Sequence, residues 1–88
     1  PNLYVAEFTN HKIRKIQISS STVSTLAGPA PGSNDSGDVN GTGNVARFKN
    51  PVALATDGTN LYVADWDNHR IRKVVLSSGE VSSLAGDG

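Results

Sequence analysis

Two stretches of this chain, 58 residues apart, carry nearly the same sequence. Residues 2–28 and 60–86 align without a gap, and 17 of the 27 aligned positions are identical. Most substitutions keep size and polarity, as in Phe8 against Trp66 and Lys12 against Arg70. Self-similarity of this kind is typical of solenoids and propellers. The repeat therefore favours a fold built from stacked copies of one small unit.

Composition removes several classes of function. The chain has 88 residues, no cysteine and equal numbers of acidic and basic residues, eight of each. It therefore lacks the long-range field of a dedicated nucleic-acid or anionic-membrane binder and has no disulfides to stabilise a small core. Apolar runs are too short for a spanning helix, so we expect no membrane insertion. Because Pro1 stands inside a repeat, we expect the chain to be a segment of a longer protein.

Alternating apolar and polar residues predict short antiparallel strands in both copies. Ile13 and Ile16 are three positions apart, as are Ile71 and Val74, which breaks the alternation and predicts a bulge. Asp57-Gly58 is a hairpin signal that adds one strand in front of the second copy. The expected strands fall within residues 2–7, 13–18, 22–28, 50–58, 60–65, 71–76 and 80–86.

Residues 29–47 separate the two copies and are rich in Gly, Ser and Pro. Crossing a four-stranded sheet needs only about 15 Å, so this loop is several times longer than required and should project or fold back as a lobe. Asp38, Asn40 and Thr42 have the spacing that begins an EF-hand loop, but Lys49 stands where its last ligand, a glutamate, is needed. We therefore expect no calcium. Asn34 and Asn40 also begin glycosylation sequons.

The turn and strand Asp65-x-x-Asn68-His69-Arg70-Ile-Arg-Lys, with LYVA before it and SLAG after it, resemble the NHL repeat. The stretch DVNGTGNVARFKNPVALATDG is similar to the long-repeat bacterial members of that family. NHL repeats form β-propellers whose blades are four-stranded sheets around a channel. The resemblance implies an all-β propeller segment of about 1.75 four-stranded antiparallel blades. Residues 1–28 would be the last three strands of one blade, 29–47 a long interblade loop, and 48–88 a complete blade.

One turn of each copy carries an acid, an asparagine and a histidine, which we call the turn motif. Such residues hold tight turns through hydrogen bonds, although the Glu7 turn should be held less well than the Asp65 turn. Amidating lyases built on similar propellers bind metal through histidines, but two histidines without a clear third ligand make a weak zinc site. We expect no metal, cofactor or catalytic group. The turn motif is Glu7, Asn10 and His11 in the first copy, and Asp65, Asn68 and His69 in the second.

Antiparallel strands place the turn motif and the loop 29–47 on one side of the segment, which we expect to be its interaction face. Phe8 and Trp66 follow the acid of each turn. Burial between blades is the favoured interpretation for these aromatics, and exposure as interface anchors is the alternative. The candidate interaction face comprises Phe8, Trp66, Asn34, Asp35, Asp38 and Asn40.

Six of the eight basic residues lie at the start of one strand in each copy. Some relatives bind RNA on a propeller face, so these residues could form a nucleic-acid stripe. Neighbouring acids cancel their charge and few aromatics are available for stacking, so a solvated strand edge that pairs with acids of the next blade is favoured. The residues are Lys12, Arg14, Lys15, Arg70, Arg72 and Lys73.

The function expected from these features is that of a non-catalytic interaction or structural scaffold module. It should assemble with other blades or with copies of itself, as an oligomer or filament, because a blade cannot bury its faces alone. We expect a protein ligand and an extracellular or cell-surface location, suggested by the polar, cysteine-free composition. A lyase-type metalloenzyme and an RNA-binding propeller are the alternatives.

Overall fold

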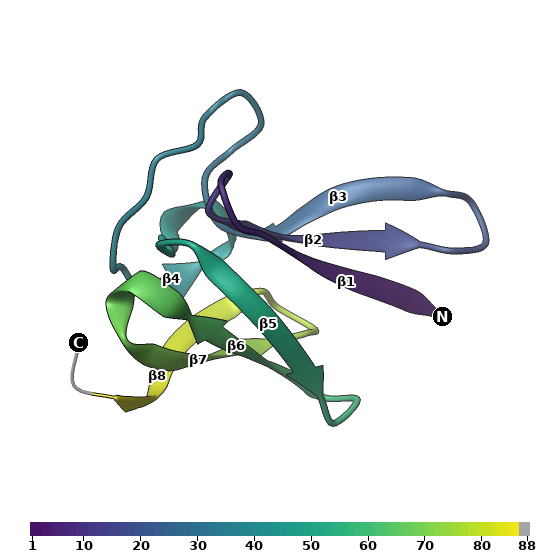
Figure 1. Cartoon of the computed structure of the whole chain (residues 1–88). Coiled ribbons are helices and arrows are strands. Elements are labelled where there is room, and N and C mark those ends of the chain that lie inside the picture. Colours follow the sequence, from purple (N-terminus) through teal and green to yellow (C-terminus); the bar gives the residue numbers. More distant parts are fainter. Residues whose placement is uncertain (87–88) are drawn as a thin grey trace.

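The computed structural model describes residues 1–86, which form two antiparallel sheets (Figure 1). The first sheet has the order β1-β2-β3, with β1 (Asn2–Glu7), β2 (Lys12–Gln17) and β3 (Thr22–Ala27). The second has the order β4-β8-β7-β6-β5. Its strands are β4 (Gly41–Thr42), β5 (Pro51–Thr56), β6 (Asn60–Asp65), β7 (Arg70–Val75) and β8 (Glu80–Gly86). The predicted all-β propeller segment is confirmed.

The two copies have the same internal geometry. β1 pairs with β2 so that Asn2 faces Gln17, and β6 pairs with β7 so that Asn60 faces Val75, 58 residues later in each strand. The register shifts after Ile13 in the first copy and after Ile71 in the second, which confirms the irregularity predicted from the broken alternation. The sequence repeat is therefore a structural repeat down to its bulges.

The predicted hairpin at Asp57 is also present, between β5 and β6. Gly58 has a φ of 91°, a conformation that glycine adopts without a steric penalty. The Asp57 carboxylate accepts hydrogen bonds from the backbone N–H groups of Thr59 and Asn60, at 2.9 and 2.7 Å. These contacts fix the turn that connects the additional strand of the second copy.

The two copies bury opposite faces against each other. Ile13 of the first sheet is fully buried, whereas the equivalent Ile71 of the second is 38% exposed. Conversely, Leu61 of the second sheet is buried and the equivalent Leu3 is 53% exposed. The core between the sheets consists of Ile13, Ala27, Ala46, Phe48, Leu61, Val63, Val74 and Val81.

The connection between the sheets folds back along the second sheet rather than remaining an irregular loop. After a bend beyond β3 it enters a segment, residues 37–50, that we call the arm (Figure 1). The arm contains β4, which pairs with β8, and the 3-10 helix η1 (Gly43–Val45). The predicted four-stranded sheet thus gains a fifth, two-residue strand on its β8 edge. Ala46 and Phe48 of the arm lie in the core, so the arm wedges between the sheets at one end.

The helices described in residues 1–86 are single 3-10 turns, η1 and η2 (Trp66–Asn68). Neither has the length or the apolar character that crossing a membrane would need.

Candidate functional site

Asp65 is the centre of the turn motif in the second copy. Its side chain lies at the end of β6 and is buried. One carboxylate oxygen accepts the backbone N–H of Lys49, at 2.8 Å, and the other accepts the Asn68 amide, at 2.7 Å, and Arg72 Nη1, at 2.8 Å. The predicted pairing of Asp65 with Asn68 is therefore present, and the same acid also ties the arm to the turn.

Arg72 is the buried partner of Asp65, and the solvated strand edge expected at this position is wrong. Its side chain has no exposed surface, and its guanidinium lies 5.1 Å from the centre of the Phe48 ring. Buried charges need partners because desolvation is costly, and the arm supplies them. Arg72 donates to the Arg47 and Val39 carbonyls and to Asn40 Oδ1, at 3.0, 2.9 and 2.8 Å, and Asp38 lies 3.7 Å away.

The first copy repeats this arrangement in a looser form. Glu7 accepts from the Asn10 amide and from Arg14 Nη1, each at 3.4 Å. Both side chains of the Glu7–Arg14 pair are 28% exposed. The less well held turn expected around Glu7 is what the structure shows, because no residue of 1–86 covers this pair as the arm covers Arg72.

The two histidines occupy left-handed backbone positions, each with a φ of 57°. The backbone N–H of His69 closes its turn by donating to the Trp66 carbonyl, at 3.2 Å. The ring of His11 instead accepts the backbone N–H of Asn50 through Nδ1, at 3.0 Å. The expected hydrogen bonds of the histidine rings to the acid and asparagine of the turn motif are not found among residues 1–86.

Lys12, which follows the histidine of the first turn, is also buried rather than solvated. Its ammonium group donates to the carbonyls of Ala30 and Ser33, at 3.4 and 3.0 Å. The equivalent Arg70 lies 3.0 Å from Asp38 of the arm. Lys12, Arg70 and Arg72 therefore hold the connection between the sheets.

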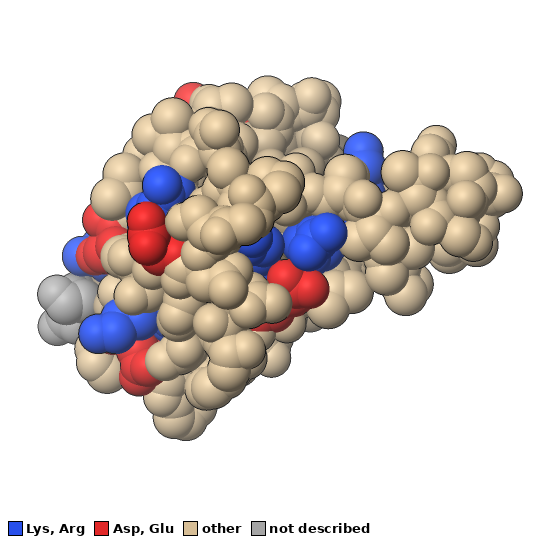
Figure 2. Space-filling model, turned by 90° about the horizontal axis from the view of Figure 1, so that it is seen from above, with Lys and Arg blue, Asp and Glu red and all other residues tan. Residues whose placement is uncertain are grey.

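Charges on the face seen from above are intermingled. Figure 2 shows acidic and basic side chains lying beside one another, with no broad basic area on this face. Asp38 and Asn40 are two of the acceptors that bind the arginines of β7. Their oxygens are therefore engaged by arginines, which makes them poor ligands for calcium. Among residues 1–86, no group of three or more His, Asp or Glu side chains is placed to hold a metal ion.

The predicted interaction face is only partly assembled. Phe8 is 50% exposed, so burial between blades, the favoured interpretation, is wrong for Phe8. Trp66 is 64% exposed, but it lines the outer face of the second sheet, which no sheet of residues 1–86 covers, so its burial between blades stays a prediction. Phe8 stays exposed although the second sheet covers one face of its own sheet. Asn34 and Asp35 are exposed in the bend, whereas Asp38 and Asn40 bind arginines of β7.

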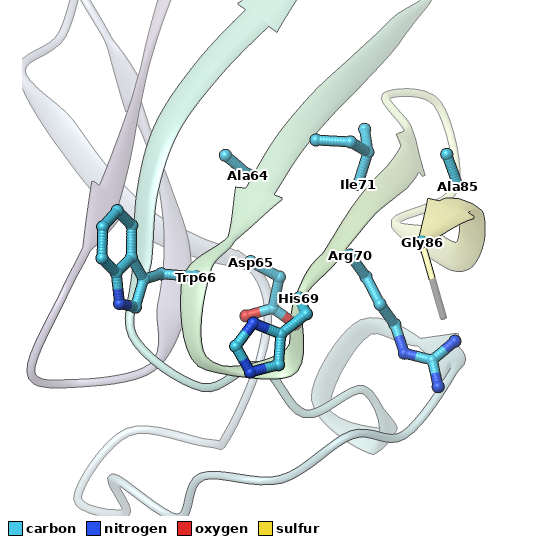
Figure 3. A pocket seen from close by; sticks show the side chains of 8 residues that line it. All are labelled: Ala64, Asp65, Trp66, His69, Arg70, Ile71, Ala85 and Gly86. Atoms are coloured by element: carbon cyan, nitrogen blue, oxygen red, sulfur yellow. The ribbon is translucent and has the colours of Figure 1, made fainter. Parts of the chain in front are cut away.

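A pocket opens on the outer face of the second sheet, the face turned away from the first sheet (Figure 3). It has a volume of about 250 Å³, and we call it the outer pocket. Figure 3 shows Trp66 at one side, Ile71 and Ala85 at the other, and His69 between them. Its lining is Ala64, Asp65, Trp66, His69, Arg70, Ile71, Ala85 and Gly86.

Sequence reasoning missed Arg72 and Phe48 as partners of the turn motif. An arginine two residues before Val74 on the buried face of β7 was a usable signal, because strand alternation puts both side chains on one face. Folding back was one of the two paths expected for this loop, but the surfaces that the arm covers were not foreseeable, since a glycine-rich segment has no periodicity to predict its path.

Comparison with known proteins places the repeat in a family. Over 86 residues, 98% of this chain, the sequence is 33% identical to NHL repeat-containing protein 2 of Homo sapiens, and the chain spans 11% of that protein. The Gallus gallus protein of the same name gives the same identity and coverage. The chloroplastic protein SUPPRESSOR OF QUENCHING 1 of Arabidopsis thaliana is 36% identical over 83 residues, 93% of this chain and 8% of that protein.

Solved structures agree on the fold. An auxiliary nutrient binding protein from Bacteroides thetaiotaomicron superposes with a TM-score of 0.79 at 22% identity, over 99% of this chain and 23% of that one. A protein of the same description from Bacteroides ovatus gives a TM-score of 0.73 at 20% identity, over 99% of this chain and 23% of that one. No family model matches the chain. With the repeat, the turn motif and the curated relatives in agreement, the chain belongs to the NHL-repeat β-propeller family.

Proposed function

We propose that this segment is a non-catalytic interaction and scaffold module, which packs its sheet faces against further blades and presents exposed aromatics to a protein ligand. The observation that carries the proposal is the reciprocal exposure of the two copies. Ile13, Leu61 and Val81 are buried, whereas their equivalents in the other copy, Ile71, Leu3 and Val23, are 38–53% exposed. A face exposed in one copy is thus a surface that the fold is built to cover.

The open faces carry apolar side chains, so their burial by a partner is favourable. The first sheet exposes Leu3 and Val23, and the second exposes Ile71 and Leu84. Burying one such side chain contributes about 1.5–3 kcal/mol. The open face of the first sheet corresponds to the face that the second sheet buries, and the open face of the second sheet corresponds to the face that the first sheet buries. Two copies of the chain would therefore join these two different faces in a head-to-tail contact. Copies of this chain are therefore a second class of partner, beside further blades.

A catalytic role is not proposed for the turn motif, because most of its polar groups already serve the fold. The Asp65 carboxylate binds Lys49, Asn68 and Arg72, and His11 binds the arm. Trp66 and Phe8 are the surface anchors available for a protein ligand, since aromatic residues are enriched among the strongest interface contacts. We further propose an extracellular or cell-surface location, supported by the polar, cysteine-free composition.

Sedimentation velocity of the chain and of charged variants tests the assembly. Leu3→Lys and Leu84→Lys each place a charge on one open face, and Ser77→Lys places the same charge at the exposed turn between β7 and β8. We expect concentration-dependent association of the chain, weakened about tenfold or more by either face variant and unchanged by Ser77→Lys. Equal sedimentation of all four proteins as monomers would contradict the proposal.

A further inference from the structure

The internal repeat shows how the outer pocket is filled. Every residue of its lining has an equivalent 58 residues earlier, and four of these equivalents, Lys12, Ile13, Ala27 and Gly28, are buried where the first sheet meets the rest of the chain. Ile13 and Ala27, the equivalents of Ile71 and Ala85, are fully buried there. The same surface therefore exists twice in the molecule, once covered and once open.

The arm covers the first of these surfaces. The backbone N–H of Asn50 donates to His11 Nδ1, at 3.0 Å, and the backbone N–H of Gly28 donates to the Gly43 carbonyl, at 3.1 Å. Phe48 of the arm belongs to the same buried cluster as Ile13 and Ala27. The arm thus covers this surface with one aromatic ring and with one backbone N–H that donates to a histidine.

In the second copy the equivalent histidine and isoleucine are present, but no arm lies over them. His69 has the same left-handed backbone as His11, with a φ of 57°. Among residues 1–86, the ring of His69 has no hydrogen-bond partner, and Ile71 is 38% exposed. The pocket presents an apolar floor and a ring nitrogen, as the first copy presents them to its arm.

We propose that the outer pocket is the docking site for the arm of a further repeat of the same kind. The N–H equivalent to that of Asn50 binds His69 Nδ1, and the aromatic ring equivalent to Phe48 covers Ile71 and Ala85. The inference rests on the proposed function and specifies which segment of a further blade binds the open face of the second sheet.

A second copy of this chain is not the occupant. The arm described within residues 1–86 already lies on His11 of its own molecule, where Asn50 and Phe48 are engaged. A second copy can therefore cover the apolar strands by head-to-tail contact without placing an arm in the outer pocket. The occupant is an arm that precedes another blade.

An extended chain tests the proposal. Residues 29–86 are repeated after Gly86, which places a new arm where the first arm follows Gly28, and the added Ile71 is replaced by valine so that only the original Ile71 methyl is observed. Broadening of this methyl signal by a soluble paramagnetic agent should fall several-fold, to the level of Ile13. In the unextended chain, Ile71 should remain the more accessible of the two.

Histidine variants give a matched control. His69→Ala should lower the equilibrium constant for folding about tenfold in the extended chain and less than twofold in the unextended one, because only the new arm supplies a donor. His11→Ala should cost about tenfold in both chains, since Asn50 is bound in each. An Ile71 methyl equally accessible in both chains, with equal effects of His69→Ala, would overturn the proposal.

A synthetic peptide of residues 37–56 provides a second measurement if the extended chain does not fold. Its titration into the unextended chain should shift the Ile71 methyl signal in a saturable way, and a peptide with Phe48→Ser should not. No shift with the native peptide would also overturn the proposal. An unextended chain that associates but whose pocket stays open when the native peptide is added contradicts the arm proposal alone. A monomeric unextended chain whose pocket accepts the peptide contradicts only the proposed assembly of copies.

Discussion

Asp65 Oδ2 lies 2.8 Å from Arg72 Nη1, and neither side chain of this ion pair is exposed. The equivalent pair of the first copy, Glu7 and Arg14, is separated by 3.4 Å, and each side chain is 28% exposed. One repeat thus holds the same pair of charges in two environments. The difference arises from the arm, whose carbonyls and Asn40 surround Arg72.

The two ion pairs should differ sharply in their effect on stability. Asp65→Ala leaves a buried guanidinium without its carboxylate and should lower the free energy of unfolding by about 3–5 kcal/mol. Glu7→Ala removes a partly exposed partner and should cost less than about 1 kcal/mol. Urea unfolding followed by circular dichroism measures both. Equal losses would show that the arm does not seal the second pair from water.

Ser21 and Gly79 occupy the same turn position in the two copies, with φ values of 60° and 76°. Ser21→Gly should raise the free energy of unfolding by about 0.5–1 kcal/mol, because glycine adopts this conformation without a steric penalty. Gly79→Ser should lower it by a larger amount, since a Cβ there would lie 2.9 Å from the Leu26 carbonyl oxygen. Thermal melting of both variants measures the asymmetry, and effects of equal size would contradict it.

The pKa of Asp57 gives a pH prediction. Hydrogen bonds from the backbone N–H groups of Asn60 and Thr59, followed by that from the Tyr62 hydroxyl, hold this pKa below its ordinary value of 3.8. A lowered pKa in the folded state means that the contribution to stability is complete above pH 3.8 and is lost as the pH falls through the folded value.

The measurement is a carbon NMR titration of the Asp57 carboxyl group, beside urea unfolding at several pH values below 3.8. Tyr62→Phe removes the hydroxyl that donates to the Asp57 carboxylate and should raise the pKa of Asp57 part of the way towards 3.8. Asp57→Asn should reduce the dependence of stability on pH in this range. An Asp57 that titrates at or above 3.8 in the native chain would show that the turn does not hold its carboxylate.

The two sequons should behave differently if the chain enters a glycosylating compartment. Asn34 is exposed in the bend, whereas the Asn40 side chain accepts a hydrogen bond from the buried Arg72. Modification of Asn40 would therefore disturb the arm. We expect glycan at Asn34 and little at Asn40, as measured by mass spectrometry after expression in secreting cells. Preferential modification of Asn40 would contradict the observed placement of its side chain.

The repeat made the strands predictable because its alternation and turn residues occur twice. The break of three positions at Ile13 and at Ile71 even foretold where the register shifts. The partners of the turn motif were harder to predict, because Arg72 and Lys12 are charged residues that the sequence places at a strand edge. Their burial depends on the arm, whose path is decided by tertiary contacts and not by local sequence pattern.

The aromatic residues of the turns were expected to be buried and are exposed, the reverse of the outcome for the charged residues. Apolar bulk at Phe8 and Trp66 favoured burial, yet both side chains are at least half exposed among the described residues. The first sheet makes the comparison informative, since Phe8 is exposed while Ile13, five positions later, is buried between the two sheets. The turn therefore projects its aromatic beyond the region that a neighbouring sheet covers.

Thermal melting at different protein concentrations tests the central claim, that each sheet has one face built to be covered by another sheet. If folding is linked to association, the Tm of the chain should rise as its concentration is raised about a hundredfold. Circular dichroism follows the loss of strand structure. A single cooperative transition whose Tm does not change with concentration, given by a monomer of 9.2 kDa, would contradict the account.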